Sequence, residues 1–260
     1  MRAQFCGVRG STPVAGPDFA RVGGHTSCLA LSGGDELPSL ILDAGTGLQT
    51  LAPRFGTRSF TGTVVLTHLH WDHLQGLPFF PPADRTDAHV VLAQPAQGDP
   101  VTVLERAMSP PHFPIGPNGL RGTWEHRGLA AEKHSFGAFS VTTRDVVHKG
   151  GRTFGIRVEH GGSSLAYVPD ALDANDDAIL DLAYGVDVLV RGTPFTAEES
   201  ERADAFGHGT VEHAVDIARE AGARRLILTH HAPTRTDAEV AHIAARSGAE
   251  VATEGLVIDV

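Results

Sequence analysis

The stretch Thr67–Leu77, THLHWDHLQGL, gathers residues that could bind metal. Three histidines and one aspartate fall within six positions there: His68, His70, Asp72 and His73. Imidazole nitrogens combined with a carboxylate suit zinc first, and then manganese, iron or cobalt. The alternative is a solvated polar loop, but four such residues at this spacing seldom meet by chance. The pattern HxHxDH therefore predicts a metal site.

An apolar strand should deliver this cluster to the edge of a sheet. The run Thr63–Leu66, TVVL, is β-branched and bounded by Gly62, which is typical of a buried strand. Side chains two residues apart on extended backbone point the same way, so His68 and His70 can share one ion. The turn that follows would swing Asp72 and His73 toward a second ion. The spacing predicts two neighbouring metals.

Length and charge limit the classes of partner. The chain has 260 residues, 41% of them apolar, so we expect one domain spanning residues 1–260. Lys and Arg number 21 and Asp and Glu 31, a net charge of −10 with no basic run. Tight, sequence-blind binding of nucleic acid usually needs a basic face, so a large polyanion is disfavoured. Small phosphorylated substrates stay open, because two divalent metals supply local positive charge.

The ends and the cysteines indicate a cytoplasmic protein. The N-terminal MRAQFCGVRG has no apolar core of a signal peptide, and nowhere do 18 apolar residues run together. We expect no membrane contact. Cys6 and Cys28 are the only cysteines, and we expect them reduced, buried and without chemistry.

The HxHxDH element resembles that of the metallo-β-lactamase-fold superfamily of hydrolases. Further landmarks follow in the family's order over nearly the whole chain: Asp43–Gly47 (DAGTG), the strand Ser164–Val168 ending in Pro169-Asp170, and Gly207–Pro233 with GHGT, a helix and LTH. The resemblance implies an α/β protein with a four-layer αββα sandwich, in which two mixed β-sheets are flanked by helices.

The resemblance also implies a ligand set. It assigns His68, His70 and His148 to one metal, Asp72, His73 and His230 to the other, and Asp170 to a bridge between them. Without the resemblance, a histidine at a strand end such as His148 is usually structural. Asp170 could instead cap a helix expected at residues 173–184.

Two further residues would support the ligands. By resemblance, Asp43 orients the HxHxDH loop or one of its imidazoles, although it could also be a helix N-cap. His231 follows His230 directly, and we expect it to act behind the ligands, with an exchange of roles between the two left open.

The run Gly207–Pro233 resembles the ribonuclease Z and cyclic-phosphodiesterase (PhnP-like) branch of the superfamily. That branch gives His208 a catalytic, non-ligand role: near its ordinary pKa of about 6.5 an imidazole can protonate or stabilise a leaving alkoxide. The chain departs from the branch twice. Val190–Thr193 (VRGT) replaces an acidic element that partners the histidine, unless Asp204 substitutes, and Gly209 replaces a serine. Arg191 could contact a second phosphate group or form a surface ion pair.

Five other residues are candidate substrate contacts. Ser11 and Thr12 lie in a turn whose backbone N–H groups could meet an anion, although such turns are often purely local. Phe79, Phe80 and Phe113 lie in proline-rich stretches and could stack on a substrate ring, or serve no such purpose.

These residues together predict a hydrolase with two divalent ions, Zn²⁺ first and Mn²⁺ open. We expect a phosphodiesterase acting on a small nucleotide or cyclic phosphate, in which a hydroxide held between the metals attacks and Asp72 and His208 are catalytic. The alternatives are tRNA 3′-end processing, although the basic arm of those enzymes is missing, and hydrolysis of a carboxylic ester, thioester or lactam. A small-molecule partner is expected rather than large nucleic acid, and a homodimer is left open.

Overall fold

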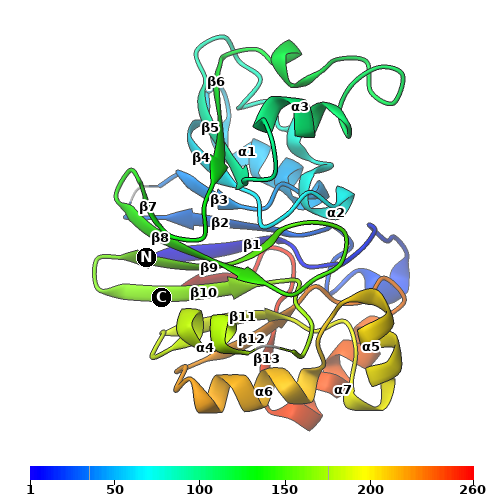
Figure 1. The fold of residues 1–260 in the computed structure, drawn as a ribbon. Coiled ribbons are helices and arrows are strands. Elements are labelled where there is room, and N and C mark those ends of the chain that lie inside the picture. The colour runs from blue at the N-terminus through cyan, green and yellow to red at the C-terminus, as the bar shows by residue number, and fades with distance from the viewer. Residues whose placement is uncertain (35, 175) are drawn as a thin grey trace.

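Two seven-stranded β-sheets pack face to face, with helices on both outer faces (Figure 1). The structure is a computed structural model that describes residues 1–34, 36–174 and 176–260. The order of layers is helices, sheet, sheet, helices, which confirms the predicted αββα sandwich with two mixed sheets.

The first sheet has the strand order β14-β1-β2-β3-β4-β5-β6. Neighbours from β14 to β3 pair antiparallel, and neighbours from β3 to β6 pair parallel. Its strands are β1 (Arg2–Gly7), β2 (Cys28–Ser32), β3 (Leu40–Leu42), β4 (Thr61–Val65), β5 (His89–Pro95), β6 (Thr123–Leu129) and β14 (Val257–Asp259).

The second sheet has the order β13-β12-β11-β10-β9-β8-β7. Neighbours from β13 to β10 pair parallel, and neighbours from β10 to β7 pair antiparallel. Its strands are β7 (Lys133–Phe136), β8 (Phe139–Val146), β9 (Thr153–His160), β10 (Ser163–Val168), β11 (Val188–Gly192), β12 (Leu226–Thr229) and β13 (Glu250–Val251).

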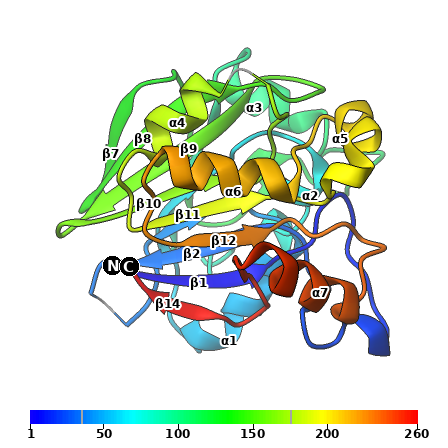
Figure 2. The ribbon, with the colours of Figure 1, turned by 90° about the horizontal axis from the view of Figure 1, so that it is seen from below.

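Helices close the outer faces and two short ones lie at one edge. In Figures 1 and 2, α2 and α5 are both at that edge, where the two sheets meet. No helix in the described part of the chain is long and apolar enough to span a bilayer. The helices are η1 (Pro17–Phe19), η2 (Thr46–Leu51), α1 (Ala52–Phe55), α2 (Trp71–Leu74), η3 (Leu77–Phe79), α3 (Pro100–Glu105), η4 (Pro117–Gly119), α4 (Asp177–Ala183), η5 (Ala197–Glu199), α5 (Ser200–Phe206), α6 (Val211–Glu220) and α7 (Asp237–Ser247).

The hydrophobic core follows the layers. The largest apolar cluster fills the space between the sheets, where Phe5 and Leu42 of the first sheet meet Ile156 and Val190 of the second. A second cluster packs η2, α1 and α3 against the first sheet, and a third packs α4 and α6 against the second. Because both faces are covered, β2 and β3 are buried at every position, which explains why they read as continuous apolar runs.

The sequence predicted most elements and missed a few. No element was predicted at β5 or α5. The pattern of residues 121–145 predicts two strands, but β6, β7 and β8 lie there. The pattern of Leu48–Phe55 predicts one helix, and the structure divides this segment between the 3₁₀ helix η2 and the α-helix α1. The helix expected at residues 173–184 is seen as α4, with residue 175 outside the described part.

A buried arginine joins the two ends of the chain. The side chain of Arg9 is inaccessible to solvent, and its guanidinium donates to the carbonyl oxygens of Gly23 (2.7 Å) and Arg235 (2.6 Å). It also lies 3.9 Å from a carboxylate oxygen of Asp237. Since a buried charge and buried carbonyls need partners, this one side chain ties the turn after β1 to the segment before α7.

We predict that Arg9→Met lowers the free energy of unfolding by about 3 kcal/mol, because it leaves buried acceptors without a donor. Urea denaturation followed by circular dichroism measures the change. Arg2→Met is the matched control, because Arg2 forms an exposed pair with Asp259 and should change stability by less than about 0.5 kcal/mol. Equal losses in the two variants would contradict this account of Arg9.

Candidate metal centre

The candidate residues meet at one edge because they follow strands that point the same way. Asp43 follows β3, and the loop that starts at Thr67 follows β4 in the first sheet. Asp170 and His230 follow the parallel strands β10 and β12, while His148 follows β8, which also runs in the direction of β10 because both are antiparallel to β9. Such an edge, at the carboxyl ends of strands, is where α/β proteins commonly bind ligands.

The structure brings every predicted ligand into one cluster. Ligand atoms within each of three groups lie within 4.8 Å of one another, close enough to hold a metal ion. The groups are His68, His70, His148 and Asp170; Asp72, His73 and His230; and Asp170, His208 and His230.

In the first group the imidazoles surround one oxygen of Asp170. Its Oδ2 lies 3.4 Å from Nε2 of His68 and 3.4 Å from Nε2 of His148. The Nδ1 of His70 lies 3.4 Å from the same His148 nitrogen. His148 donates its other ring proton to the carbonyl of Gly207 at 2.6 Å, which leaves the Nε2 lone pair free to face the cluster.

In the second group the same aspartate offers its other oxygen. Oδ1 of Asp170 lies 2.9 Å from Nε2 of His230, and that nitrogen lies 3.2 Å from Oδ2 of Asp72 and 3.3 Å from Nε2 of His73. One carboxylate therefore has an oxygen toward each group. This is the arrangement that a bridge between two cations requires.

The electrostatics of the cluster fit divalent cations. Burial lowers the pKa of His68 and His70, so both imidazoles are neutral and have a lone pair to give. The Nε2 of His68 is buried with no hydrogen-bond partner among the described residues. Burial alone would raise the pKa of Asp170, but His230 and His73 outweigh it and hold that pKa well below its usual range. The carboxylates of Asp170 and Asp72 in turn raise the pKa of His73 and of His230, the latter to about 9. Without an ion these two imidazoles balance the buried anions by holding protons, and a bound cation would take the place of those protons.

Asp43 connects the loop to the second sheet. Its fully buried carboxylate accepts from the backbone N–H of Thr67 (2.8 Å), Nδ1 of His73 (2.8 Å) and the hydroxyl of Tyr167 (3.0 Å). The hydrogen bond that Nδ1 of His73 donates to Asp43 fixes the tautomer of His73, so that Nε2 faces the cluster. The N-cap alternative is wrong, because Gly45 occupies the N-cap of η2.

Backbone strain gathers at the same place. Ser11, Asp43 and His230 have φ angles of 63°, 61° and 56°, and no other non-glycine residue in the described ranges has a positive φ. Each such residue costs about 1–3 kcal/mol. Next to them, Gly10 cannot be replaced, because a Cβ there would lie 2.3 Å from the His230 ring.

His208 lies against the cluster, and no carboxylate among the described residues forms a hydrogen bond to its ring. Its ring centroid is 5.1 Å from that of His148 and 5.2 Å from that of His230. Burial lowers its pKa from the ordinary value to about 4, so the imidazole is neutral at pH 7. Asp204 does not substitute for the acidic partner, because it is exposed on α5 and makes no hydrogen bond to His208.

Both expectations for Arg191 are wrong. The side chain is completely buried, and its guanidinium donates to the carbonyls of Ala171 (3.0 Å) and Gly192 (3.1 Å) and lies 3.6 Å from Asp173. It can neither reach a phosphate group nor form a surface pair. The structure also explains Gly209: a Cβ there would lie 2.6 Å from the guanidinium and 2.2 Å from the Asp173 carboxylate. The two departures from the family pattern are therefore one change in packing.

The expected anion contacts at Ser11 and Thr12 are also wrong. The N–H of Ser11 donates to Oδ2 of Asp72 at 2.6 Å, and the N–H of Thr12 donates to the carbonyl of Gly10 at 2.7 Å. Neither is left for a ligand. Ser11 instead holds Asp72 in place.

Four more candidates, one histidine and three phenylalanines, lie away from the cluster. His231 donates from Nε2 to the carbonyl of Ala252 at 3.1 Å, so its ring points away and His230 is the histidine that faces the site. Phe80 is buried in the core below the first sheet, and Phe79 pairs with Phe113 at 5.9 Å. None of these phenylalanines lines the cavity at the metal centre.

The cavity has aromatic walls that the sequence analysis did not single out. Its volume is about 420 Å³, and it is lined by Ser11, Leu69, His70, Trp71, Asp72, His148, Asp170, Phe206 and His208. Trp71 stands inside the HxHxDH motif and Phe206 stands two residues before His208, and this proximity is the signal that could have found them.

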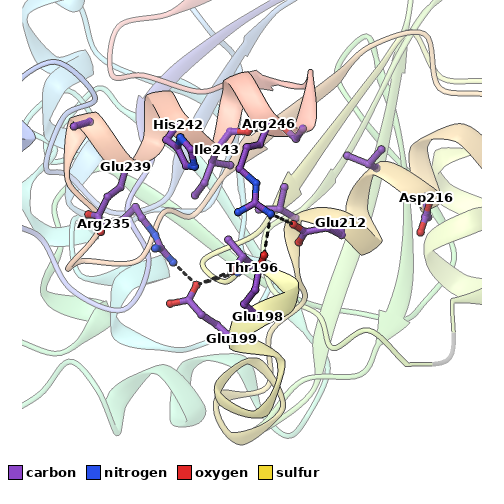
Figure 3. A pocket seen from close by; sticks show the side chains of 14 residues that line it. Thr196, Glu198, Glu199, Glu212, Asp216, Arg235, Glu239, His242, Ile243 and Arg246 are labelled. Atoms are coloured by element: carbon purple, nitrogen blue, oxygen red, sulfur yellow. Dashed lines mark hydrogen bonds and ion pairs between the residues drawn. The ribbon is translucent and has the colours of Figure 1, made fainter.

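A larger cavity lies elsewhere. It has a volume of about 860 Å³ between η5, α6 and α7 (Figure 3). Its acidic residues Glu198 and Glu199 pair with Arg246 (2.9 Å) and Arg235 (2.5 Å). No member of the histidine cluster lines it, so it is not part of the candidate centre.

An ion-pair network supports the segment that follows His208. Asp173 accepts from the N–H and the hydroxyl of Thr210, both at 2.8 Å, and pairs with Nδ1 of His213 at 2.7 Å. His213 also contacts Asp176 at 3.0 Å. The contact of the His213 ring N–H with the Asp173 carboxylate, together with the charge of both carboxylates, raises the pKa of His213.

Comparison with known proteins adds a family. Residues 39–231 match the model of the Beta-lactamase superfamily domain. A protein of Haloarcula marismortui named ribonuclease Z is 25% identical, over 88% of this chain and 86% of its own length.

Two solved structures share the fold. One is the metallo-beta-lactamase fold protein YhfI from Bacillus subtilis, with a TM-score of 0.77, 20% identity and 99% of each chain covered. The other is a diphosphatase from the PhnP family, with a TM-score of 0.76, 18% identity, and 100% of this chain and 97% of that chain covered.

We predict that Asp43→Asn lowers the affinity for a divalent cation about 10- to 100-fold, because an amide cannot hold the His73 tautomer as a carboxylate does. Competition with a chromophoric zinc chelator measures the affinity. Asp259→Asn, an exposed aspartate of β14, is the control and should bind zinc like the parent protein. Unchanged affinity in Asp43→Asn would remove the positioning role of this residue.

We predict that His213 stabilises the fold more at acid than at alkaline pH. A histidine with a raised pKa contributes stability that is complete below its unfolded pKa of about 6.5 and is lost as pH rises through its folded pKa. The difference in free energy of unfolding between the parent protein and His213→Gln should therefore shrink from about pH 6 upward. Urea denaturation across this range tests it, and a difference that does not vary with pH would refute it.

Proposed function

The chain belongs to the beta-lactamase superfamily, and from this premise we propose that it is a dinuclear-metal phosphodiesterase acting on a small nucleotide or cyclic phosphate. The family and the ribonuclease Z relatives identify a metal-dependent hydrolase. The number of metals, their identity as zinc and the class of substrate are our proposal.

The proposed ligands follow from the cluster. His68, His70 and His148 would hold one cation, Asp72, His73 and His230 the other, and Asp170 would bridge them, since its two oxygens face the two groups. Two divalent cations would place positive charge beside the phosphate oxygens. They would also lower the pKa of a bound water molecule, so that it ionises near neutral pH. The chain provides the rest: Ser11 and Asp43 fix the orientation of Asp72 and His73.

The proposal that the substrate is a phosphodiester rests on His208. It lies in the GHGT element, with a ring nitrogen within 4.8 Å of ligand atoms of Asp170 and His230. A neutral, buried imidazole can donate a hydrogen bond from its ring N–H to a phosphate oxygen and so stabilise the charge that develops there. The carbonyl of Gly207 holds His148, so one short segment positions a ligand and His208 together.

Cleavage of tRNA 3′ ends is a second candidate. It is favoured by relatives named ribonuclease Z that align over 88% of this chain. It is disfavoured by the net charge of −10 and by a cavity that no lysine or arginine lines within the described residues. A polyanionic substrate usually needs such cations.

We expect the zinc or manganese form to hydrolyse bis(p-nitrophenyl) phosphate, measured by release of p-nitrophenolate. The metal-stripped protein should be inactive until metal is restored. A precursor tRNA distinguishes the second candidate. Its cleavage at rates above those on small diesters would overturn the small-substrate proposal.

In the same assay His208→Ala should lower kcat about 100-fold, the loss expected for one hydrogen-bond donor to developing charge, with the same metal content by elemental analysis. Loss of bound metal would instead make His208 a ligand. Full activity on diesters would remove it from the mechanism and favour ester or lactam hydrolysis.

A further inference from the structure

Two large aromatic side chains stand exposed at the mouth of the metal centre. Trp71 is 72% exposed and Phe206 is 59% exposed, and both line the cavity that contains His70, Asp170 and His208. We propose that they form an aromatic clamp for a nucleobase, so that the substrate is a nucleoside phosphodiester rather than a base-free cyclic phosphate. This inference rests on the proposed phosphodiesterase function.

The two rings come from opposite halves of the fold. Trp71 is the first residue of α2, between the candidate ligands His70 and Asp72, and α2 follows a strand of the first sheet. Phe206 ends α5, which lies between β11 of the second sheet and α6. Figures 1 and 2 both place α2 and α5 at the same edge. A flat group attached to a phosphodiester at the centre would therefore meet an aromatic side chain from each half.

Phe206 is a fixed platform. Its ring stacks on Phe195 with centroids 6.2 Å apart and planes 14° apart. Phe195 is itself covered by the guanidinium of Arg202 at 5.3 Å and lies 6.1 Å from the ring of His208. The packing that positions His208 thus also positions Phe206. Trp71 is the more exposed of the two side chains and can adjust to the ligand.

Exposed rings of this size need a reason. An aromatic side chain buries about 150–250 Å² when it is covered, and leaving that surface wet forfeits hydrophobic stabilisation. The position of Trp71 and Phe206 indicates the reason, because both rings line the cavity of the candidate ligands. Tyr184 is 75% exposed as well, but it lines a different cavity.

The charges around the cavity favour one phosphodiester with an uncharged ring attached. Among the described residues no lysine or arginine lines it, and the nearby Lys149 donates its ammonium to the carbonyl of Ala205. A second phosphate group would find no cation beyond the metals. The part of the substrate beyond the phosphodiester must therefore be recognised by apolar contact. The cavity volume of about 420 Å³ suits a ligand of nucleotide size.

Stacking also predicts how selective the site is. Base–aromatic stacking tolerates any base, since every base presents a π-face. The clamp should therefore accept purine and pyrimidine nucleotides and discriminate against substrates that lack a base.

Tryptophan fluorescence tests the clamp without any hydrolysis. The chain has two tryptophans, Trp71 and Trp124, so the Trp124→Phe variant leaves Trp71 as the only reporter. AMP added to the zinc-loaded variant should quench its emission, and ribose 5-phosphate should not. In the Trp124→Phe background, a second substitution, Phe206→Ala, should weaken AMP binding about tenfold. The control substitution Tyr184→Ala in the same background should leave AMP binding unchanged. Absence of quenching by AMP, or equal quenching by ribose 5-phosphate, overturns the clamp.

Kinetics provide the second test. Thymidine 5′-p-nitrophenyl phosphate and methyl p-nitrophenyl phosphate share a leaving group, and a nucleoside in the first stands where the second has a methyl group. In Trp71→Ala and in Phe206→Ala the ratio of kcat/KM for the first over the second should fall about tenfold, through KM, and Trp71→Phe should restore most of it. An unchanged ratio overturns the clamp. If the parent protein cleaves neither diester, the proposed function fails, and the fluorescence result still decides the clamp.

Discussion

Three carboxylates are withdrawn from water where the two sheets meet. Asp43 is fully buried and Asp72 and Asp170 nearly so, and burying an unpaired carboxylate costs several kcal/mol. Hydrogen bonds offset part of that free-energy cost, and for Asp43 the donors are Thr67, His73 and Tyr167. Asp72 and Asp170 have mainly imidazole nitrogens around them, and those histidines are the candidate metal ligands. The packing of both sheets, the strained backbone and the orientation of the histidines all serve to hold these charges together.

Much of the candidate metal centre could be predicted from the sequence, because most of its residues stand in a short motif or directly after an apolar strand. HxHxDH places four candidates within six residues, and the strand before it fixes the direction in which they face. Asp43 and Asp170 each follow an apolar strand, so the topology of the sheet brings them to the same edge. The layered fold follows from the same alternation of strands and helices.

The rest depends on tertiary contacts that a single sequence does not reveal. Arg191 looks like a polar residue after a strand, but Asp173 and two carbonyls receive its guanidinium inside the protein, and Gly209 exists to make room for it. The amide of Ser11 looked free until Asp72 was seen to accept from it. Phe206 lies on a helix that the sequence did not predict, so its exposure beside the cavity could not be anticipated.

The pairing of β1 with β14 has a consequence for the order in which the protein can be completed. His68, His70 and Asp72 leave the ribosome well before His230 and β14. Until those later segments dock, the group of Asp72 and His73 lacks His230, and the first sheet lacks an edge strand. The histidine cluster is therefore completed only after synthesis has passed β12, although its first members are made much earlier.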